Sequence, residues 1–274
     1  MKSIIFLLVI CVQVVVLTNH LSAQTKKATQ TQKAQPQSSY YCPPCGDCDK
    51  TAYKAAGKCP VCGMELVKQT VAEHNKNDKR LKVAFYLQDG VEVLDFAGPM
   101  EVFAYANFDI FTVSATKDQI KSQGILKITP DYSIDDAPHA DILVFFGGNA
   151  GTAATNPKVI DWVKKQADVD YYFSVCTGAF ILGKAGLLDN LTATTFHLSI
   201  DDLQREIPKA KVLKNVRFVD NGKVITTAGI SAGIDGALHL VGKIRGTETA
   251  KQIAAYMEYD KWVPAQGLVI AQAE

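Results

Sequence analysis

From Leu81 onward, short continuous apolar runs alternate with amphipathic stretches. A continuous apolar run of about four to eight residues is typical of a parallel strand that is buried on both faces. The stretches between the runs have the length and periodicity of helices. This alternation predicts an α/β domain over residues 81–274, a flavodoxin-like sandwich in which a mostly parallel sheet carries helices on both faces.

The pattern also predicts where the elements lie. Asn221-Gly222 is expected to form the tight turn of a hairpin. Strands are expected at 81–87, 108–116, 140–148, 170–175, 211–215 and on both sides of that turn within 217–229. Helices are expected at 100–107 after Gly98-Pro99, at 157–169 with Pro157 near the start, directly after Cys176, and at 231–246 and 247–260.

The length of 274 residues with 47% hydrophobic residues suits one medium globular domain with appendages. The net charge of +1 gives no broad electrostatic field toward nucleic acid or anionic membranes. No DNA-binding extension is expected after the last helix, so we expect no nucleic acid partner.

Residues 1–23 have the features of a signal peptide. Lys2 supplies a positive start, an apolar run extends from Ile4 to Leu17, and a small-residue cleavage site ends at Ala23. An uncleaved membrane anchor is the alternative, which the run disfavours because it is shorter than about 20 residues. We expect export, to the periplasm, and no membrane span after cleavage.

Two polar segments flank a cysteine module at 40–67. Residues 24–39 contain only Ala as an apolar residue and cannot bury a core, so a linker is expected there. Residues 68–80 are polar and highly charged, which indicates a second linker.

The module contains two Cys-x-x-Cys pairs, and two such pairs can arrange four thiolates tetrahedrally around one soft ion. Zinc and copper are the candidates, and the Met64 thioether would favour copper(I). Cys48 is an alternative ligand, and disulfide pairing is the alternative chemistry after export. The expected ligands are Cys42, Cys45, Cys59 and Cys62.

The segment "YYCPPC…GKCPVCGMEL" resembles the small heavy-metal-binding domain of metal-efflux and periplasmic proteins. The resemblance covers about 27 residues and implies a zinc- or copper-type site at the four expected ligands. That family usually has Met-His after the first Cys-Pro, whereas this chain has Pro44-Cys45, so its metal preference is not carried over.

Cys176 stands alone, between an expected strand and an expected helix, in "SVCTGAF". A nucleophile at such a turn projects from the carboxyl edge of the sheet, and Ser174 and Gly178 are small enough for a sharp elbow. The start of the next helix is expected to lower the thiol pKa and favour thiolate. The alternative is an inert buried thiol. The amides of Gly148 and Thr177 are candidates for an oxyanion hole.

Four segments together resemble the ThiJ/PfpI superfamily, which has the class I glutamine amidotransferase-like fold. These are "VAFYLQDGVEVLDFAGPMEVF", "DILVFFGGNAGT", "SVCTGAFILGKAGLLDNLTATTFH" and "RFVDNGKVITTAGISAGIDGALHLV". The resemblance covers residues 81–262. The Cys-Thr-Gly elbow, "LDFAGP" and "AGISAGID" are similar to the branch that holds isonitrile hydratases and the amidotransferase-like domains of AraC-type regulators.

The resemblance implies roles for individual residues. Cys176 would be the nucleophile, and Asp95 would be a carboxylic acid that touches the sulfur and shares a proton with it. Thr177 would orient substrate, and Gly148 would contribute the second oxyanion amide. No cofactor is expected at the Cys176 site, and a homodimer is expected.

One departure bears on the reaction. The protease-like branch has His directly after the nucleophile, whereas this chain has Thr177, which disfavours peptidase or Cys-His amidase chemistry. His197 is the nearest substitute, but the branch more often has "ATTHW" where this chain has "ATTFH", so Phe196 takes the expected histidine position. His197 is therefore either a residue of the substrate pocket or an ordinary surface histidine.

These observations favour an enzyme that uses Cys176 on a small electrophilic substrate, by isonitrile hydratase-like conversion to an N-substituted formamide. The alternatives are a ligand- or metal-sensing protein without turnover and a redox or metal-stress protein whose thiols are themselves the function.

Overall fold

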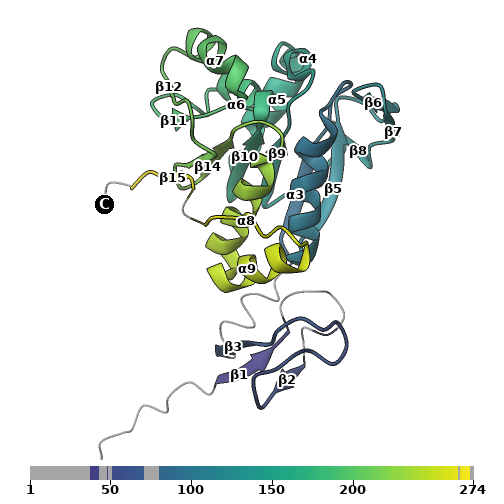
Figure 1. Ribbon diagram of the computed structural model, residues 1–274. Coiled ribbons are helices and arrows are strands. Elements are labelled where there is room, and N and C mark those ends of the chain that lie inside the picture. Colours follow the sequence, from purple (N-terminus) through teal and green to yellow (C-terminus); the bar gives the residue numbers. More distant parts are fainter. Residues whose placement is uncertain (1–37, 43–47, 49–50, 71–79, 265, 272–274) are drawn as a thin grey trace, which may run out of the picture. The chain divides into compact units, whose positions relative to one another are not determined.

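The computed structural model of the chain describes residues 38–42, 48, 51–70, 80–264 and 266–271 (Figure 1). The expected signal peptide and most of the linker at 24–39 lie outside these residues, so export and linker character stay predictions. Among the described helices, none is long and apolar enough to cross a membrane.

The cysteine module contains a three-stranded antiparallel sheet in the order β2-β1-β3. Its strands are β1 (Ser38–Tyr41), β2 (Ala52–Tyr53) and β3 (Val67–Thr70). Because Ser38 pairs with Thr70 at one end of this sheet, the ordered module extends beyond the expected limits of 40 and 67. Residues 38–39 and 68–70 add backbone pairing to the sheet and no apolar side chains, so the sequence pattern gave no sign of them.

The α/β domain is built on an eight-stranded sheet in the order β15-β13-β14-β10-β9-β4-β5-β8. Its strands are β4 (Lys82–Tyr86), β5 (Asp109–Ser114), β8 (Tyr132–Ser133), β9 (Ile142–Phe145), β10 (Tyr171–Val175), β13 (Phe218–Asp220), β14 (Val224–Thr227) and β15 (Leu268–Val269). All neighbours in this sheet are parallel except β13 and β14, which form the hairpin expected at Asn221-Gly222. Two small pairs lie outside it: β6 (Ile120–Ser122) with β7 (Leu126–Ile128), and β11 (Thr192–Ala193) with β12 (Lys211–Val212).

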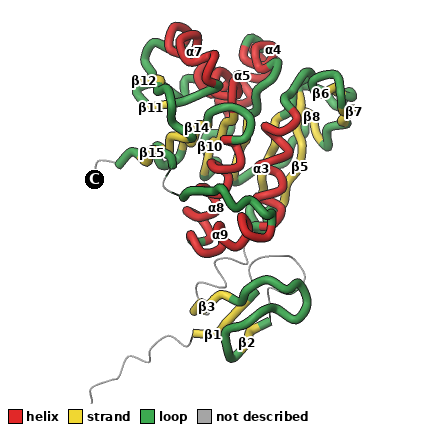
Figure 2. Tube along the Cα trace, viewed as in Figure 1, coloured by secondary structure: helices red, strands yellow, loops and turns green. Residues whose placement is uncertain are grey.

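Successive residues of the central strands supply two cores, one on each face of the sheet. Val83 and Phe85 of β4 pack in one core with α3, α8 and α9, while Ala84 and Tyr86 pack in the other with α4, α5, α6 and α7. Figures 1 and 2 show α3 and α8 close together in front of the sheet. The helices are α3 (Val93–Tyr105), α4 (Ala150–Ala154), α5 (Pro157–Lys165), α6 (Ala179–Lys184), α7 (Ile200–Glu206), α8 (Ala232–Arg245) and α9 (Thr247–Tyr256). This arrangement confirms the predicted α/β fold with helices on both faces.

Helix α3 differs from the expectation in a way that matters for the site. It begins at Val93 rather than at residue 100, and Pro99 lies inside it. A proline within a helix removes one backbone hydrogen bond, but the apolar face of α3 still packs against the sheet. Gly98 keeps the crossing with α8 close, since a Cβ there would lie 2.7 Å from Cγ1 of Ile234. Asp95 is thereby fixed in the first helical turn.

Candidate functional site

Cys176 lies at the carboxyl end of β10, between β9 and β14 in the middle of the sheet. It begins a 3-10 turn, η1 (Cys176–Gly178), that leads directly into α6. Its φ of +58° is a strained conformation for a residue with a side chain. Gly178 makes the turn possible, because a Cβ there would lie 2.4 Å from the carbonyl oxygen of Phe145. The chain therefore forms a sharp elbow at Cys176.

Asp95 is completely buried and is held by two backbone amides. The amide of Gly147 donates to Oδ2 at 2.9 Å, and the amide of Ile230 donates to Oδ1 at 3.0 Å. A Cβ on Gly147 would lie 2.7 Å from Oδ2 of Asp95 and 2.7 Å from Sγ of Cys176. The carboxyl group and the thiol thus meet beside Gly147, where a side chain has no room.

Burial dominates the electrostatics of this pair. It raises the pKa of Asp95 to about 7, with a contribution from the charge of Glu92, although the amides of Gly147 and Ile230 act in the opposite direction. Burial and then the charge of Asp95 raise the pKa of the Cys176 thiol to about 12, against hydrogen bonds from Thr177. Between these values the pair holds one proton.

The lowered thiol pKa that the sequence led us to expect is therefore not found. The helix that was expected to lower it is short, since α6 spans only Ala179–Lys184 after the 3-10 turn. Its dipole is correspondingly weak. The thiol is instead buried against a carboxyl group, and both effects disfavour the isolated thiolate.

Thr177 and Gly148 are hydrogen-bonded to each other beside the nucleophile. The hydroxyl of Thr177 donates to the carbonyl oxygen of Gly148 at 3.4 Å, and the backbone amide of Thr177 acts to lower the pKa of the Cys176 thiol. Gly148 has a φ of +80° and bridges to Val91. That bridge uses the amides of Glu92 and Asn149, so within the described residues the Gly148 amide has no acceptor.

A pocket of about 480 Å³ lies next to the elbow; its wall includes neighbours of Cys176, although Cys176 itself is not among the lining residues. Thr195, in its wall, donates its hydroxyl to the carbonyl oxygen of Cys176 at 2.7 Å. Gly229, also in the wall, has no room for a side chain, since a Cβ would lie 2.4 Å from Cδ2 of Phe196 and 3.3 Å from Sγ of Cys176. The lining residues are Thr194, Thr195, His197, Ile200, Lys214, Asn215, Val216, Arg217, Ala228 and Gly229.

His197 lines this pocket but lies at the exposed surface, in the short turn η2 (His197–Ser199). Its ring contacts Phe196 edge to face, with ring centroids 4.4 Å apart. Phe196, rather than the histidine, packs against Gly229 beside the thiol. Among the described residues, no hydrogen bond joins His197 to Cys176 or Asp95.

Several residues of the site were not singled out from the sequence. Thr195, Gly229 and Arg217 all lie in segments that carry the family resemblance, yet nothing in their spacing distinguishes them, whereas the Gly147-Gly148 pair was expected only to supply an oxyanion amide. Gly147 and Gly229 matter because of what they leave room for, which only the folded arrangement shows.

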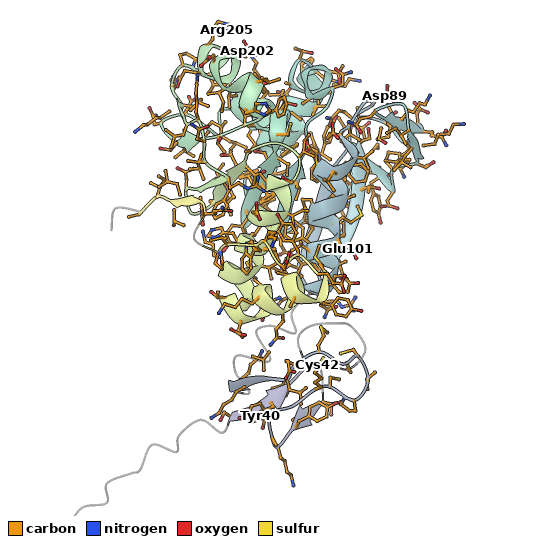
Figure 3. The ribbon with its side chains drawn as sticks, in the orientation of Figure 1. Tyr40, Cys42, Asp89, Glu101, Asp202 and Arg205 are labelled. Carbon is orange, nitrogen blue, oxygen red and sulfur yellow. The ribbon has the colours of Figure 1, made fainter. Side chains whose placement is uncertain are left out.

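The cysteine module brings four sulfur atoms together. The Sγ atoms of Cys42, Cys48, Cys59 and Cys62 all lie within 4.8 Å of one another. Tetrahedral thiolate ligands at about 2.3 Å from zinc are about 3.8 Å apart, so this cluster fits such an ion. Figure 3 shows Cys42 among the side chains of the module. Cys45 lies outside the described residues, and Cys48, the alternative ligand, completes the described cluster.

The thiols of the cluster are buried or partly buried, and no disulfide joins the described cysteines. Burial acts to raise the pKa of Cys59, but hydrogen bonds from the backbone of Cys62 and Val61 and from neighbouring thiols outweigh it, so this pKa is lowered to about 6. A thiolate at neutral pH is the form that binds metal. Met64 packs against the cluster from the apolar side.

Comparisons with known proteins agree with this architecture. Residues 81–243 match the DJ-1/PfpI family, and residues 39–69 match the heavy metal binding domain. The isonitrile hydratase of Pseudomonas putida is 33% identical over 65% of this chain and 78% of its own length. A crystal structure of a ThiJ/PfpI family protein from Pseudomonas syringae aligns with a TM-score of 0.63 at 29% identity, covering 68% of this chain and 78% of that one.

Transcriptional regulators are also similar. The HTH-type regulator GbdR of Pseudomonas aeruginosa is 26% identical over 70% of this chain, and the chain spans only 53% of the length of that regulator. The same domain is therefore similar both to an enzyme and to part of a regulator.

Proposed function

The chain belongs to the DJ-1/PfpI family, and on that premise we propose that it hydrates a small isonitrile to an N-substituted formamide with Cys176 as the nucleophile. The observation that supports this most is the buried pair of Asp95 and Cys176, which together hold one proton over a wide pH range. Hydration of an isonitrile needs a nucleophile and an acid at the same carbon, and this pair supplies both.

The one-proton pair reacts in its thiolate form, with the proton on Asp95. The sulfur bonds to the terminal isonitrile carbon, and Asp95 transfers the shared proton to that carbon, which gives a thioimidate. Water then adds to the same carbon, one water proton goes to the nitrogen, and the other returns to the pair. The carbon–sulfur bond breaks and releases the formamide and the starting pair, so atoms and charges balance.

Other residues position these groups. The Thr177 amide stabilises charge on the sulfur, and Thr195 holds the Cys176 carbonyl. The Gly148 amide is the candidate donor to charge that develops on the substrate or on the attacking water. Phe196 packs against Gly229 beside the thiol, where a histidine was expected.

Ligand binding without turnover is the second candidate. The raised thiol pKa favours it, because a buried neutral thiol is a weak nucleophile, and the relatives include a regulator. In that case the pocket beside Gly229 would hold a ligand and Cys176 would only line it.

For the module, we propose a zinc or copper ion bound by Cys42, Cys48, Cys59 and Cys62. When bound, the ion would hold the loops of the small sheet together, because a segment of this length has little core of its own. Titration of the full chain with each metal, followed by elemental analysis, identifies the ion. A homodimer also stays a proposal, which sedimentation analysis would test.

The function is tested by incubating the purified protein with an aliphatic isonitrile and, separately, with a small dicarbonyl. Formamide production that is lost in both Cys176→Ala and Asp95→Ala supports the hydratase. Gly151→Ala is a suitable control variant, since a Cβ there meets no other group within 4 Å. If neither substrate is consumed while a small ligand still binds the pocket, the hydratase is refuted and the binding function is favoured.

A further inference from the structure

The pocket beside the nucleophile is basic. Its lining includes Lys214, Arg217 and the imidazole of His197, together with the amide side chain of Asn215, and no carboxylate lines it. Gly229 belongs to the same wall and lies next to the Cys176 sulfur. A ligand that fills this pocket therefore lies near hydrogen-bond donors and positive charge, and the pocket wall at Gly229 adjoins the thiol.

Arg217 is held in a fixed orientation at this wall. Its guanidinium group forms a salt bridge with Asp235, whose side chain is only 3% exposed, and Nη2 donates to the Ser231 hydroxyl at 3.3 Å. Asp235 is itself fixed by the Tyr259 hydroxyl, which donates to Oδ1 at 3.1 Å. The arginine therefore lines the pocket in a fixed orientation.

Lys214 provides a second positive charge. It pairs with Asp201 at 2.9 Å, but the Asp201 side chain is 82% exposed. Ion pairs at such exposed positions are weak and exchange readily with other partners. A bound anion can therefore replace Asp201 as the partner of Lys214 at little cost.

We propose that the substrate is a small organic anion, an isonitrile bearing a carboxylate that Arg217 and Lys214 bind while its isonitrile carbon faces Cys176. The isonitrile part of this statement rests on the proposed function, whereas the carboxylate part rests on the pocket. A charge-assisted hydrogen bond that is lost from such a site lowers binding by about tenfold to a hundredfold.

The test compares isocyanoacetate with its methyl ester, which has the same reacting group without the charge. The wild-type protein is expected to have a kcat/KM at least about tenfold higher for the acid, and Arg217→Met is expected to lower the acid-to-ester ratio by about tenfold or more. Lys214→Met, which leaves no buried group unpaired, and Arg217→Lys, which keeps the charge beside Asp235, should lower it less. Lys209→Met, outside the pocket, should leave it unchanged.

Binding is measured separately, by titrating the Cys176→Ser variant with N-formylglycinate, the product that hydration of isocyanoacetate would give. The anion site is supported if N-formylglycinate binds more weakly to the double variants, in which Cys176→Ser is combined with Lys214→Met or Arg217→Lys, than to Cys176→Ser alone. If no isonitrile is consumed but this weakening is observed, only the hydratase is refuted. If the wild-type protein converts the acid and the ester equally well, and neither Arg217→Lys nor Lys214→Met changes the acid-to-ester ratio of kcat/KM, the anion site is refuted while the hydratase is supported. Absence of both turnover and binding overturns both.

Discussion

Replacing Asp95 by Asn should change how the stability of the α/β domain depends on pH. The buried carboxyl group has a pKa of about 7 in the folded chain against an ordinary value of 3.8. Between these two pH values the folded domain keeps a proton that the unfolded chain has lost. The stabilisation from this proton is complete below about pH 4 and is lost as pH rises through about 7.

The size of the effect follows from the same two values. A difference of about three pH units corresponds to about 4 kcal/mol, since one unit is about 1.4 kcal/mol. Asn stays uncharged at every pH, so the variant does not have this loss. The free energy of unfolding of Asp95→Asn, relative to wild type, is therefore expected to rise by on the order of 3–4 kcal/mol between about pH 4 and pH 8.

Urea unfolding followed by tryptophan fluorescence measures this directly. Both tryptophans, Trp162 and Trp262, lie in the α/β domain, so the signal does not depend on the cysteine module. Cys176→Ser is the matched control, because it keeps the buried carboxyl group and should keep the pH dependence. A difference between Asp95→Asn and wild type that stays within about 1 kcal/mol over this range would refute the claim that burial raises the pKa of Asp95.

Three further outcomes are expected. Gly147→Ala would place a Cβ 2.7 Å from both reacting groups, so it should destabilise the domain by about 1–3 kcal/mol in urea unfolding and slow alkylation of Cys176 as followed by mass spectrometry. Gly151→Ala should have neither effect. Alkylation of Cys176 at about pH 8 should be on the order of tenfold faster in Asp95→Asn, because the Asp95 charge no longer adds to the effect of burial on the thiol pKa. An unchanged alkylation rate would mean that burial alone raises the thiol pKa. Cys48→Ser should weaken metal binding as much as Cys59→Ser in competition with a chelator, and a larger loss in Cys45→Ser would instead assign the fourth ligand to the first Cys-x-x-Cys pair.

The sequence predicted the α/β fold well because its information is local and repeated. Continuous apolar runs mark buried strands, and each expected strand from 81 to 175 contains an observed one. The start of α3 was wrong because Gly98-Pro99 has a strong local preference to end or begin a helix, and packing of the apolar face against the sheet outweighed it. Short helices such as α4 and α7 carry too few residues for a clear periodic pattern.

The site was predictable only in part. The elbow at Cys176 follows from small neighbours and from its place after a strand, and Asp95 was assigned by resemblance rather than by any spacing between the two. Arg217 was not singled out, because its role depends on Asp235, which is 18 residues away in the sequence and reaches it only through the crossing of β13 and α8. The thiol pKa was predicted with the wrong sign, since burial is a property of the folded chain.

The arrangement around Asp95 also explains why Thr177 can follow the nucleophile where a protease-like relative has histidine. A Cys-His enzyme needs the imidazole to take the thiol proton and later to protonate the leaving group. Here the buried carboxyl group already shares the thiol proton, and its pKa of about 7 makes it both a competent acid and a competent base near neutral pH. The residue after the nucleophile then need not carry a proton: the Thr177 amide acts to lower the thiol pKa, and its hydroxyl donates to the Gly148 carbonyl oxygen. Turnover of the substrate should therefore require the one-proton state of the pair, and kcat/KM should increase as pH rises through about 7.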